Sequence, residues 1–241
     1  IMIIEFFGPP CSGKTFCSRI LEKNLDNLLP TNEIIPKYAN KLLKLSSFEK
    51  ISLKYFLLIK KKRTKYFLRK GEKIKSKQKK LIKNYFYISY KKICKKLFLM
   101  FKKSNPKFVN LYINEIKLSP KNKKIYYDWF IEHSAKYYLA NKFLENKVIV
   151  FDEGFLQRIF TLLKLRKNYD KKILEFLKVI NLPNYIIYLN NKPNKLHIRS
   201  KKRSQRNKNA FNYNSLAEVK SYQKLTNSMV KTLYKIQNDK K

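Results

Sequence analysis

Short apolar runs occur at three places along this chain. Residues 2–7, 148–151 and 185–189 are mostly aliphatic or aromatic, and each run stops at glycine, proline, asparagine or acidic residues. Runs of this length, bounded by turn-forming residues, predict buried strands of a parallel sheet. The first run passes through a glycine turn into a helical pattern that begins at Lys14 and ends before Pro30. This order predicts a strand–turn–helix unit.

Helical periodicity dominates the rest of the chain. Ser119 and Pro120 predict the N-cap and first position of a helix that ends near Asn146. Further helices are predicted for residues 155–165, 170–180 and 215–237, and a basic helix and loop for residues 194–212. Strands therefore alternate with helices, which is the order typical of an α/β protein.

Residues 37–118 differ in composition from the rest of the chain. They are rich in lysine, nearly free of glycine and proline, and helical in period. Within them, five apolar residues fall on one helix face: Ile82, Phe86, Ile93, Leu97 and Phe101. Two interpretations stay open: ordinary amphipathic helices that pack on the core, or a basic helical insertion that docks on anionic lipid or a large anionic acceptor.

Charge narrows the choice of partners only in part. The 241 residues include 56 Lys and Arg against 16 Asp and Glu, a formal net charge of +40. A chain with this much positive charge is attracted to polyanions, so we expect weak association with nucleic acid or an anionic membrane as one possibility. The excess is mostly lysine and accompanies many Asn, Ile, Phe and Tyr residues, so a compositional bias toward A/T-rich codons explains it equally well.

The cysteines and the hydropathy of the chain bear on its compartment. Cys11, Cys17 and Cys94 show neither CxxC spacing nor a His partner at metal-ligand spacing, so we expect no zinc site and a reducing environment. No run of about 18 uncharged apolar residues is present, which predicts no transmembrane segment. The first strand follows without a basic leader. Together these features predict a cytoplasmic protein.

The strongest motif lies directly after the first predicted strand. It fills the pattern GxxxxGK[ST] with Gly8, Pro9, Pro10, Cys11, Ser12, Gly13, Lys14 and Thr15. Glycines let the backbone curl so that successive N–H groups point at phosphates, and the helix N-terminus adds a favourable field. Lys14 would place a positive charge at the β- and γ-phosphates, and Thr15 would offer its hydroxyl to Mg²⁺. The motif predicts a nucleotide-binding loop.

Two further groups of residues follow the later strands. Asp152 and Glu153 end the run 148–151, where a carboxylate would hold Mg²⁺ and its neighbour would take a proton from an attacking hydroxyl. A solvated pair of acids is the competing interpretation. Arg199 and Arg203 are four residues apart and share a helix face within the Arg-rich segment 194–212. There they would stabilise charge on a transferring phosphoryl group, unless they are simply solvated.

With these residues in place, the chain resembles the P-loop kinases of small molecules, the group of thymidylate, adenylate and deoxynucleoside kinases. The resemblance covers about residues 2–25 and 147–240, and it includes the segment Phe151-Asp-Glu-Gly-Phe-Leu-Gln-Arg158. It implies a three-layer P-loop NTPase fold of α/β class, in which a parallel sheet is flanked by helices. It further implies one kinase-like domain over residues 1–241, with a basic helical insertion at 37–118 and a lid at 194–212.

The resemblance also implies roles for individual residues. ATP would contact residues 8–15 together with Arg199 and Arg203, and Mg²⁺ would contact Thr15 and Asp152. Lys14, Glu153, Arg199 and Arg203 would be the catalytic residues, and Arg158 would contact the acceptor. The Asp-Arg-Tyr/His and Glu-Arg-Ser triplets that mark thymidylate and deoxynucleoside kinases are absent, because Gly154 follows Glu153.

We therefore expect an ATP- and Mg²⁺-dependent phosphotransferase that acts on a small-molecule hydroxyl or phosphate. A nucleoside or nucleotide, as for thymidylate kinase, and a sugar or glycan are both open as acceptors. A sulfotransferase-like protein fits less well, because that class lacks the complete GKT ending with a separate metal carboxylate. The remaining alternative is a nucleotide-dependent module that binds nucleic acid or membrane and uses ATP hydrolysis as a switch.

Overall fold

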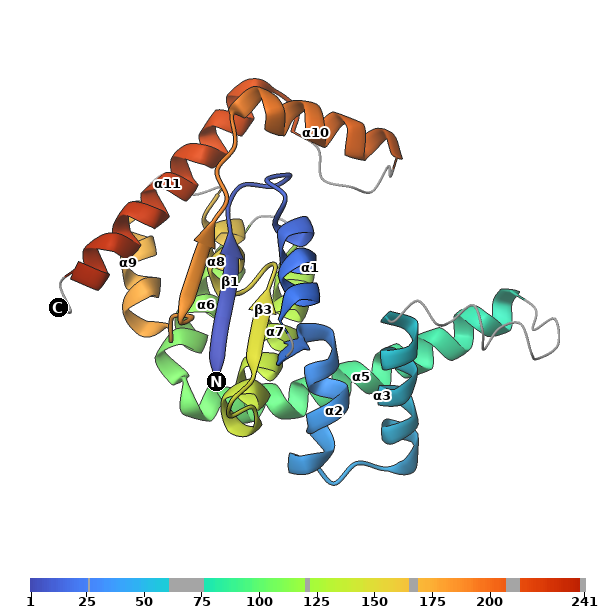
Figure 1. The fold of residues 1–241 in the computed structure, drawn as a ribbon. Helices are drawn as coiled ribbons and strands as arrows, with labels where there is room; N and C mark the ends of the chain where they lie inside the picture. The colour runs from blue at the N-terminus through green and yellow to red at the C-terminus, as the bar shows by residue number, and fades with distance from the viewer. Residues whose placement is uncertain (26, 61–75, 120–121, 165–168, 207–212, 239–241) are drawn as a thin grey trace. The chain divides into compact units, whose positions relative to one another are not determined.

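The structure is a computed structural model that describes residues 1–241 except 26, 61–75, 120–121, 165–168, 207–212 and 239–241 (Figure 1). Four strands form one parallel sheet: β1 (Met2–Phe7), β2 (Leu28–Pro30), β3 (Val148–Phe151) and β4 (Tyr185–Tyr188). Their order in the sheet is β2-β3-β1-β4. Helices flank the sheet, so the predicted α/β class with a parallel sheet between helices is confirmed.

The sequence pattern predicted only three of these strands. β2 was missed because it has three residues and ends at Pro30, which the pattern marked as a helix breaker. β2 stands at the end of the strand order. Proline is tolerated on such an edge strand, since its missing N–H leaves no inner ladder bond unmade.

The described residues form ten helices. These are α1 (Lys14–Asn24), α2 (Thr31–Leu42), α3 (Ser47–Lys60), α5 (Ser76–Ser104), α6 (Pro106–Leu118), α7 (Lys123–Phe143), α8 (Phe155–Leu163), α9 (Tyr169–Val179), α10 (Pro193–Arg206) and α11 (Leu216–Asn238). The predicted helix start at Pro120 and the predicted loop after α10 lie outside the described residues. Helix α2 begins at Thr31, ahead of the predicted insertion, and contains Pro36.

The chain divides into two compact units. The first contains residues 29–106 and 128–149 together with Ile1, and the second contains residues 2–28, 107–127 and 150–241. The predicted insertion 37–118 is thus divided, with residues 37–106 in the first unit and 107–118 in the second.

Helices α2, α3 and α5 pack on one another in the first unit (Figure 1). Ile93, Leu97 and Phe101 of α5 are at most 5% exposed, so the predicted apolar face is buried at these three positions. Phe86 is half-buried, and the side chain of Ile82 lies outside the described part of the chain. Phe56 of α3 stacks on Tyr90 of α5, with ring centroids 4.3 Å apart. Aliphatic and aromatic burial of this kind stabilises a helical unit by roughly 1.5–3 kcal/mol for each large side chain.

The second unit places the elements that carry the candidate motifs. β1 and β4 pair in parallel, with Glu5 opposite Ile186 and Phe7 opposite Tyr188. Helices α1 and α8 pack on β1, and α10 packs on α11. The carboxyl ends of β1 and β4 point toward α10 (Figure 1). Ligands of open α/β sheets bind at the carboxyl ends of the strands, so we expect a site at this end of the sheet.

Buried aromatic side chains of α6 and α9 pack together with the first residue of α8. Phe155 at the start of α8 contacts Phe108 of α6 edge to face, with centroids 5.0 Å apart. Phe176 of α9 contacts the same Phe108 at 6.2 Å and Tyr112 at 6.0 Å. All four side chains are at most 2% exposed. Because cores resist even small changes in volume, this packing fixes α8 and the residues that precede it.

Candidate functional site

The backbone of the loop between β1 and α1 makes sharp turns. Gly8, Cys11 and Gly13 have φ angles of 153°, 65° and 104°, a region that side chains other than glycine rarely adopt. The Ser12 N–H donates to the Pro9 carbonyl at 3.2 Å and closes a turn. A Cβ atom on Gly8 would lie 2.4 Å from the carbonyl oxygen of Leu189, so the close approach to the end of β4 also requires glycine.

Helix α1 begins at this loop without a side-chain cap. Gly13 is its N-cap residue and makes no capping hydrogen bond. The N–H groups of Phe16 and Cys17 both donate to the Gly13 carbonyl, at 2.9 and 3.0 Å. The N–H groups of Lys14 and Thr15 come before them and have no acceptor inside the helix. An uncapped helix start of this kind is suited to an anion.

Lys14 folds its ammonium group into the loop. Its Nζ donates to the carbonyls of Gly8 at 2.8 Å and Pro9 at 3.1 Å, and the residue is 6% exposed. Burial lowers the pKa of Lys14 from 10.5 to about 8, and the nearby Glu153 carboxylate opposes this change. The charge is therefore poorly solvated, and a phosphate at this place would stabilise it.

Thr15 and Asp152 bring a hydroxyl and a carboxylate together. Thr15 Oγ1 donates to Asp152 Oδ2 at 3.0 Å, although the two residues are 137 positions apart in the chain. Within the described residues, no group of three or more His, Cys, Asp and Glu side chains could hold a metal by itself. A hydroxyl and one carboxylate oxygen nevertheless fit Mg²⁺, which takes one or two protein ligands and completes its shell with water and substrate phosphates.

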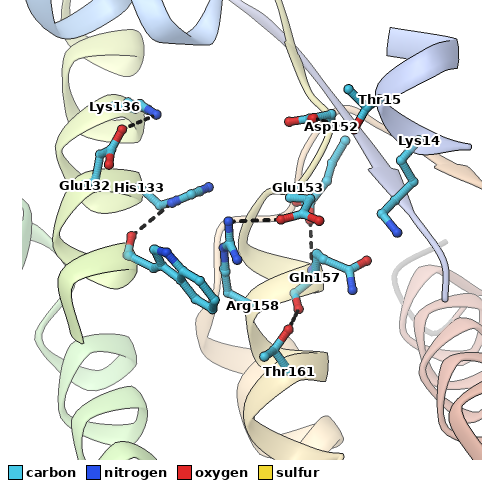
Figure 2. Close-up of polar contacts among 12 residues, drawn as sticks. Lys14, Thr15, Glu132, His133, Lys136, Asp152, Glu153, Gln157, Arg158 and Thr161 are labelled. Carbon is cyan, nitrogen blue, oxygen red and sulfur yellow. Dashed lines mark hydrogen bonds and ion pairs between the residues drawn. The ribbon is translucent and has the colours of Figure 1, made fainter. Parts of the chain in front are cut away.

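Glu153 and Arg158 form an ion pair at the start of α8. Arg158 Nη2 lies 3.1 Å from Glu153 Oε2, and the two side chains are 11% and 44% exposed (Figure 2). Burial raises the pKa of the adjacent Tyr112, and the Arg158 guanidinium opposes that rise. The predicted base, which precedes α8, and the predicted acceptor residue, which lies on α8, are thus in contact with each other.

A buried acid of β1 holds this part of α8 in place. Glu5 is fully buried, and its Oε1 accepts a hydrogen bond from the main-chain N–H of Gln157 at 3.1 Å. Gly154 lies so close that a Cβ atom there would come 2.4 Å from Glu5 Oε2. A carboxylate at the first turn of a helix is stabilised by the free N–H groups and the helix dipole. Glu5 therefore fixes the segment that carries Asp152 and Glu153.

The Arg-rich helix α10 lies beside the loop. Burial raises the pKa of the Cys11 thiol, and the positive charges of Arg203, Lys14 and Arg199 oppose that rise. Both arginines are exposed. The Arg206 side chain and residues 207–212 of the predicted lid lie outside the described part of the chain.

Asn191 and Tyr213, which both follow β4 in the chain, hydrogen-bond to the loop between β1 and α1. The Tyr213 hydroxyl donates to the Pro10 carbonyl at 3.0 Å, while its main-chain N–H donates to Ser200 Oγ of α10 at 3.3 Å. Asn191 Nδ2 donates to the Ser12 carbonyl at 3.0 Å. Tyr213 is 1% exposed and packs with Leu196 and Val219. These bonds satisfy the carbonyls of Pro10 and Ser12.

The structure brings the predicted site residues together from distant parts of the chain. Lys14, Thr15, Asp152 and Glu153 gather at one end of β1 and β3, and the charge of Arg203 reaches Cys11. The pattern did not single out Glu5, Asn191 or Tyr213 as part of the site. A charged residue inside an otherwise apolar strand was a usable signal for Glu5, but nothing in the sequence pointed to Asn191.

The geometry above is the whole basis for assigning a function. Comparisons with protein-family models, with curated proteins and with solved structures found no match to this chain.

Proposed function

We propose that this chain is an ATP- and Mg²⁺-dependent phosphotransferase of the P-loop kinase type. The observation that carries the proposal is the buried ammonium of Lys14, held in a loop of positive φ angles directly beside the contact between Thr15 and Asp152. A poorly solvated cation next to uncapped N–H groups favours a polyphosphate over a neutral ligand. The roles that the sequence suggested are compatible with this arrangement.

The loop and α1 would bind the triphosphate. Two of the three Lys14 donors are used by the Gly8 and Pro9 carbonyls in the described structure, which leaves one for a β- or γ-phosphate oxygen. The N–H groups at the start of α1 would bind further phosphate oxygens. Thr15 Oγ1 and Asp152 Oδ2 would hold Mg²⁺, which supplies charge neutralisation at the β- and γ-phosphates when bound.

Glu153 and the arginines would act on the transferred group. In the reaction, the acceptor oxygen forms a bond to the γ-phosphorus, the bond to the β,γ-bridging oxygen breaks, and ADP leaves with that electron pair. Glu153 would receive the proton of the acceptor hydroxyl, and Arg158 holds the Glu153 carboxylate in place at 3.1 Å. Arg199 and Arg203 would stabilise the charge that develops on the phosphoryl oxygens.

Isothermal titration with Mg²⁺–ATP tests the first step. We expect micromolar binding by the unmodified chain and about 10- to 100-fold weaker binding by Lys14→Met, since a charge-assisted contact to phosphate contributes about 1.5–3 kcal/mol. Lys23→Met, an exposed change on the same helix, is the matched control and should bind normally. Equal affinity in the two variants would reject the assignment of the loop.

A second function, association with an anionic membrane surface, is favoured by one face of α5. Tyr85, Ile88 and Leu99 are 59%, 51% and 59% exposed, and Lys92 and Lys95 fall between them on the same exposed stripe. Apolar side chains interleaved with lysines suit the interface of a bilayer with acidic headgroups, where charge and burial add. None of the helices in the described ranges is long and apolar enough to span a membrane.

Vesicle flotation tests this second function. The chain should float with phosphatidylcholine vesicles that contain phosphatidylglycerol and remain behind with phosphatidylcholine alone. Combined replacement of Tyr85, Ile88 and Leu99 by serine should reduce flotation, whereas Tyr234→Ser, an exposed change on α11, should not. Unchanged flotation of the triple variant, or equal retention by duplex DNA, would indicate nonspecific charge attraction instead.

A further inference from the structure

Gln157 has a buried side-chain oxygen that makes no hydrogen bond with the described residues. The residue lies in the first turn of α8 and is 4% exposed. Its main-chain N–H donates to Glu5 Oε1 at 3.1 Å, and its carbonyl accepts a bond from Thr161 Oγ1 at 2.8 Å. In contrast, its side-chain Oε1 accepts no hydrogen bond from any residue that the structure describes. Buried polar atoms without partners are rare and costly, so each one calls for an explanation.

The place of this amide within the second unit suggests the explanation. Gln157 follows the proposed base Glu153 by four residues and immediately precedes Arg158, so it is close along the chain to both. Its side chain extends from α8 toward Lys14 (Figure 2). Glu5 fixes the main chain at this residue, which limits how far the amide can move away. The side-chain oxygen is thus held, with no partner in the described part of the chain, beside the groups proposed to handle the transferred phosphoryl group.

We propose that Gln157 binds the phosphate acceptor and that the acceptor is a compound with neighbouring hydroxyl groups, such as a polyol or a sugar. This inference rests on the proposed function. One hydroxyl of the acceptor would approach Glu153 and take the phosphoryl group, while a second hydroxyl would donate to Gln157 Oε1. Both protein groups accept hydrogen bonds, and Arg158 is engaged with Glu153. A phosphate monoester, which presents acceptor oxygens, is less suited to this pair than an alcohol.

Replacement of Gln157 by methionine separates an acceptor-binding role from a structural one. Methionine has nearly the same length and no hydrogen-bonding group, so it removes the unpaired oxygen without leaving a cavity. We expect an unchanged or higher melting temperature, because no bond within the protein is lost. Leu163→Met, a buried change at the far end of α8, controls for introduction of methionine into this helix.

The assay measures transfer from radiolabelled ATP with Mg²⁺ to glycerol, glucose, uridine and uridine monophosphate. We expect transfer to a hydroxyl of one of the first three. With that compound, Gln157→Met should raise the acceptor KM about 10-fold, the loss of one or more hydrogen bonds to substrate, with the KM for ATP unchanged. Leu163→Met should change neither KM.

Any of three results with the Gln157 variant or the acceptors would overturn the inference about Gln157, and a fourth is given below. They are transfer only to the phosphate of uridine monophosphate, an acceptor KM that Gln157→Met does not change, and a fall of several degrees in the melting temperature of that variant. Failure of the proposed function is recognised separately, as absence of Mg²⁺–ATP binding by the unmodified chain. Transfer to none of the four compounds despite ATP binding would also reject the inference.

Discussion

The buried ammonium of Lys14 should make the free energy of unfolding depend on pH. Its pKa falls from 10.5 to about 8 in the folded chain, chiefly because burial removes water from the charge. At about 1.36 kcal/mol per pH unit, this corresponds to roughly 3 kcal/mol that the charged side chain costs the folded state near neutral pH. Substitution of Lys14 by methionine removes that cost, together with the hydrogen bonds to Gly8 and Pro9.

The sign of the pH dependence follows from proton binding. Between about pH 8 and pH 10.5, the unfolded chain retains the Lys14 proton while the folded chain has released it. Because the unfolded state then binds more protons, the contribution of Lys14 to stability rises with pH across this window. The many other lysines and tyrosines titrate as well, so only the difference between two variants isolates Lys14.

Urea unfolding between about pH 7 and pH 10 measures that difference. We expect Lys23→Met to gain about 2–3 kcal/mol of unfolding free energy relative to Lys14→Met over this range. Mg²⁺–ATP should bind the unmodified chain up to about 10-fold more weakly for each pH unit above 8, as Lys14 loses the proton that pairs with phosphate. A stability difference that is flat, or that falls with rising pH, would refute the burial of this charge.

Three further changes test other contacts of the site. Asp152→Asn should leave the urea midpoint nearly unchanged but abolish the effect of Mg²⁺ on ATP affinity, measured by titrations with and without chelator. Persistence of that effect in the variant would show that Asp152 does not hold the metal. Gly154→Ala should destabilise the chain by about 1–3 kcal/mol in urea, because its Cβ would meet Glu5 at 2.4 Å; a neutral result would mean that Glu5 is not held there. Tyr213→Phe should cost about 1 kcal/mol and raise the KM for ATP, since the loop carbonyl of Pro10 loses its donor, and an unaltered KM would show that this bond does not position the loop.

The local elements of the fold were predictable from the sequence for simple reasons. Period and composition identified β1, β3 and β4 and the helices around them, because buried strands and amphipathic helices each have their own spacing of apolar residues. The same spacing identified the buried face of α5. It failed at β2, where three residues give no period to read.

The loop motif was predictable because its chemistry is local. Residues 8–15 carry their own glycines, lysine and threonine, and the positive φ angles at Gly8 and Gly13 follow from those residue types. The place of Asp152 was predictable only in part. Its position after an apolar run predicts that it lies at the carboxyl end of a strand, but not which residue it contacts. That it meets Thr15 at 3.0 Å depends on the pairing of strands far apart in the chain.

The sequence by itself determined most of the elements and the glycine-containing turn at residues 8–15, because both depend on residues that are close along the chain. Only the tertiary structure decided that Glu5 holds the start of α8, that Tyr213 bonds the loop, and that the Gln157 side-chain oxygen is buried without a partner among the described residues. These contacts join residues more than 150 positions apart or depend on burial from every side. Neither distance in space nor the loss of water can be read from a spacing of residue types.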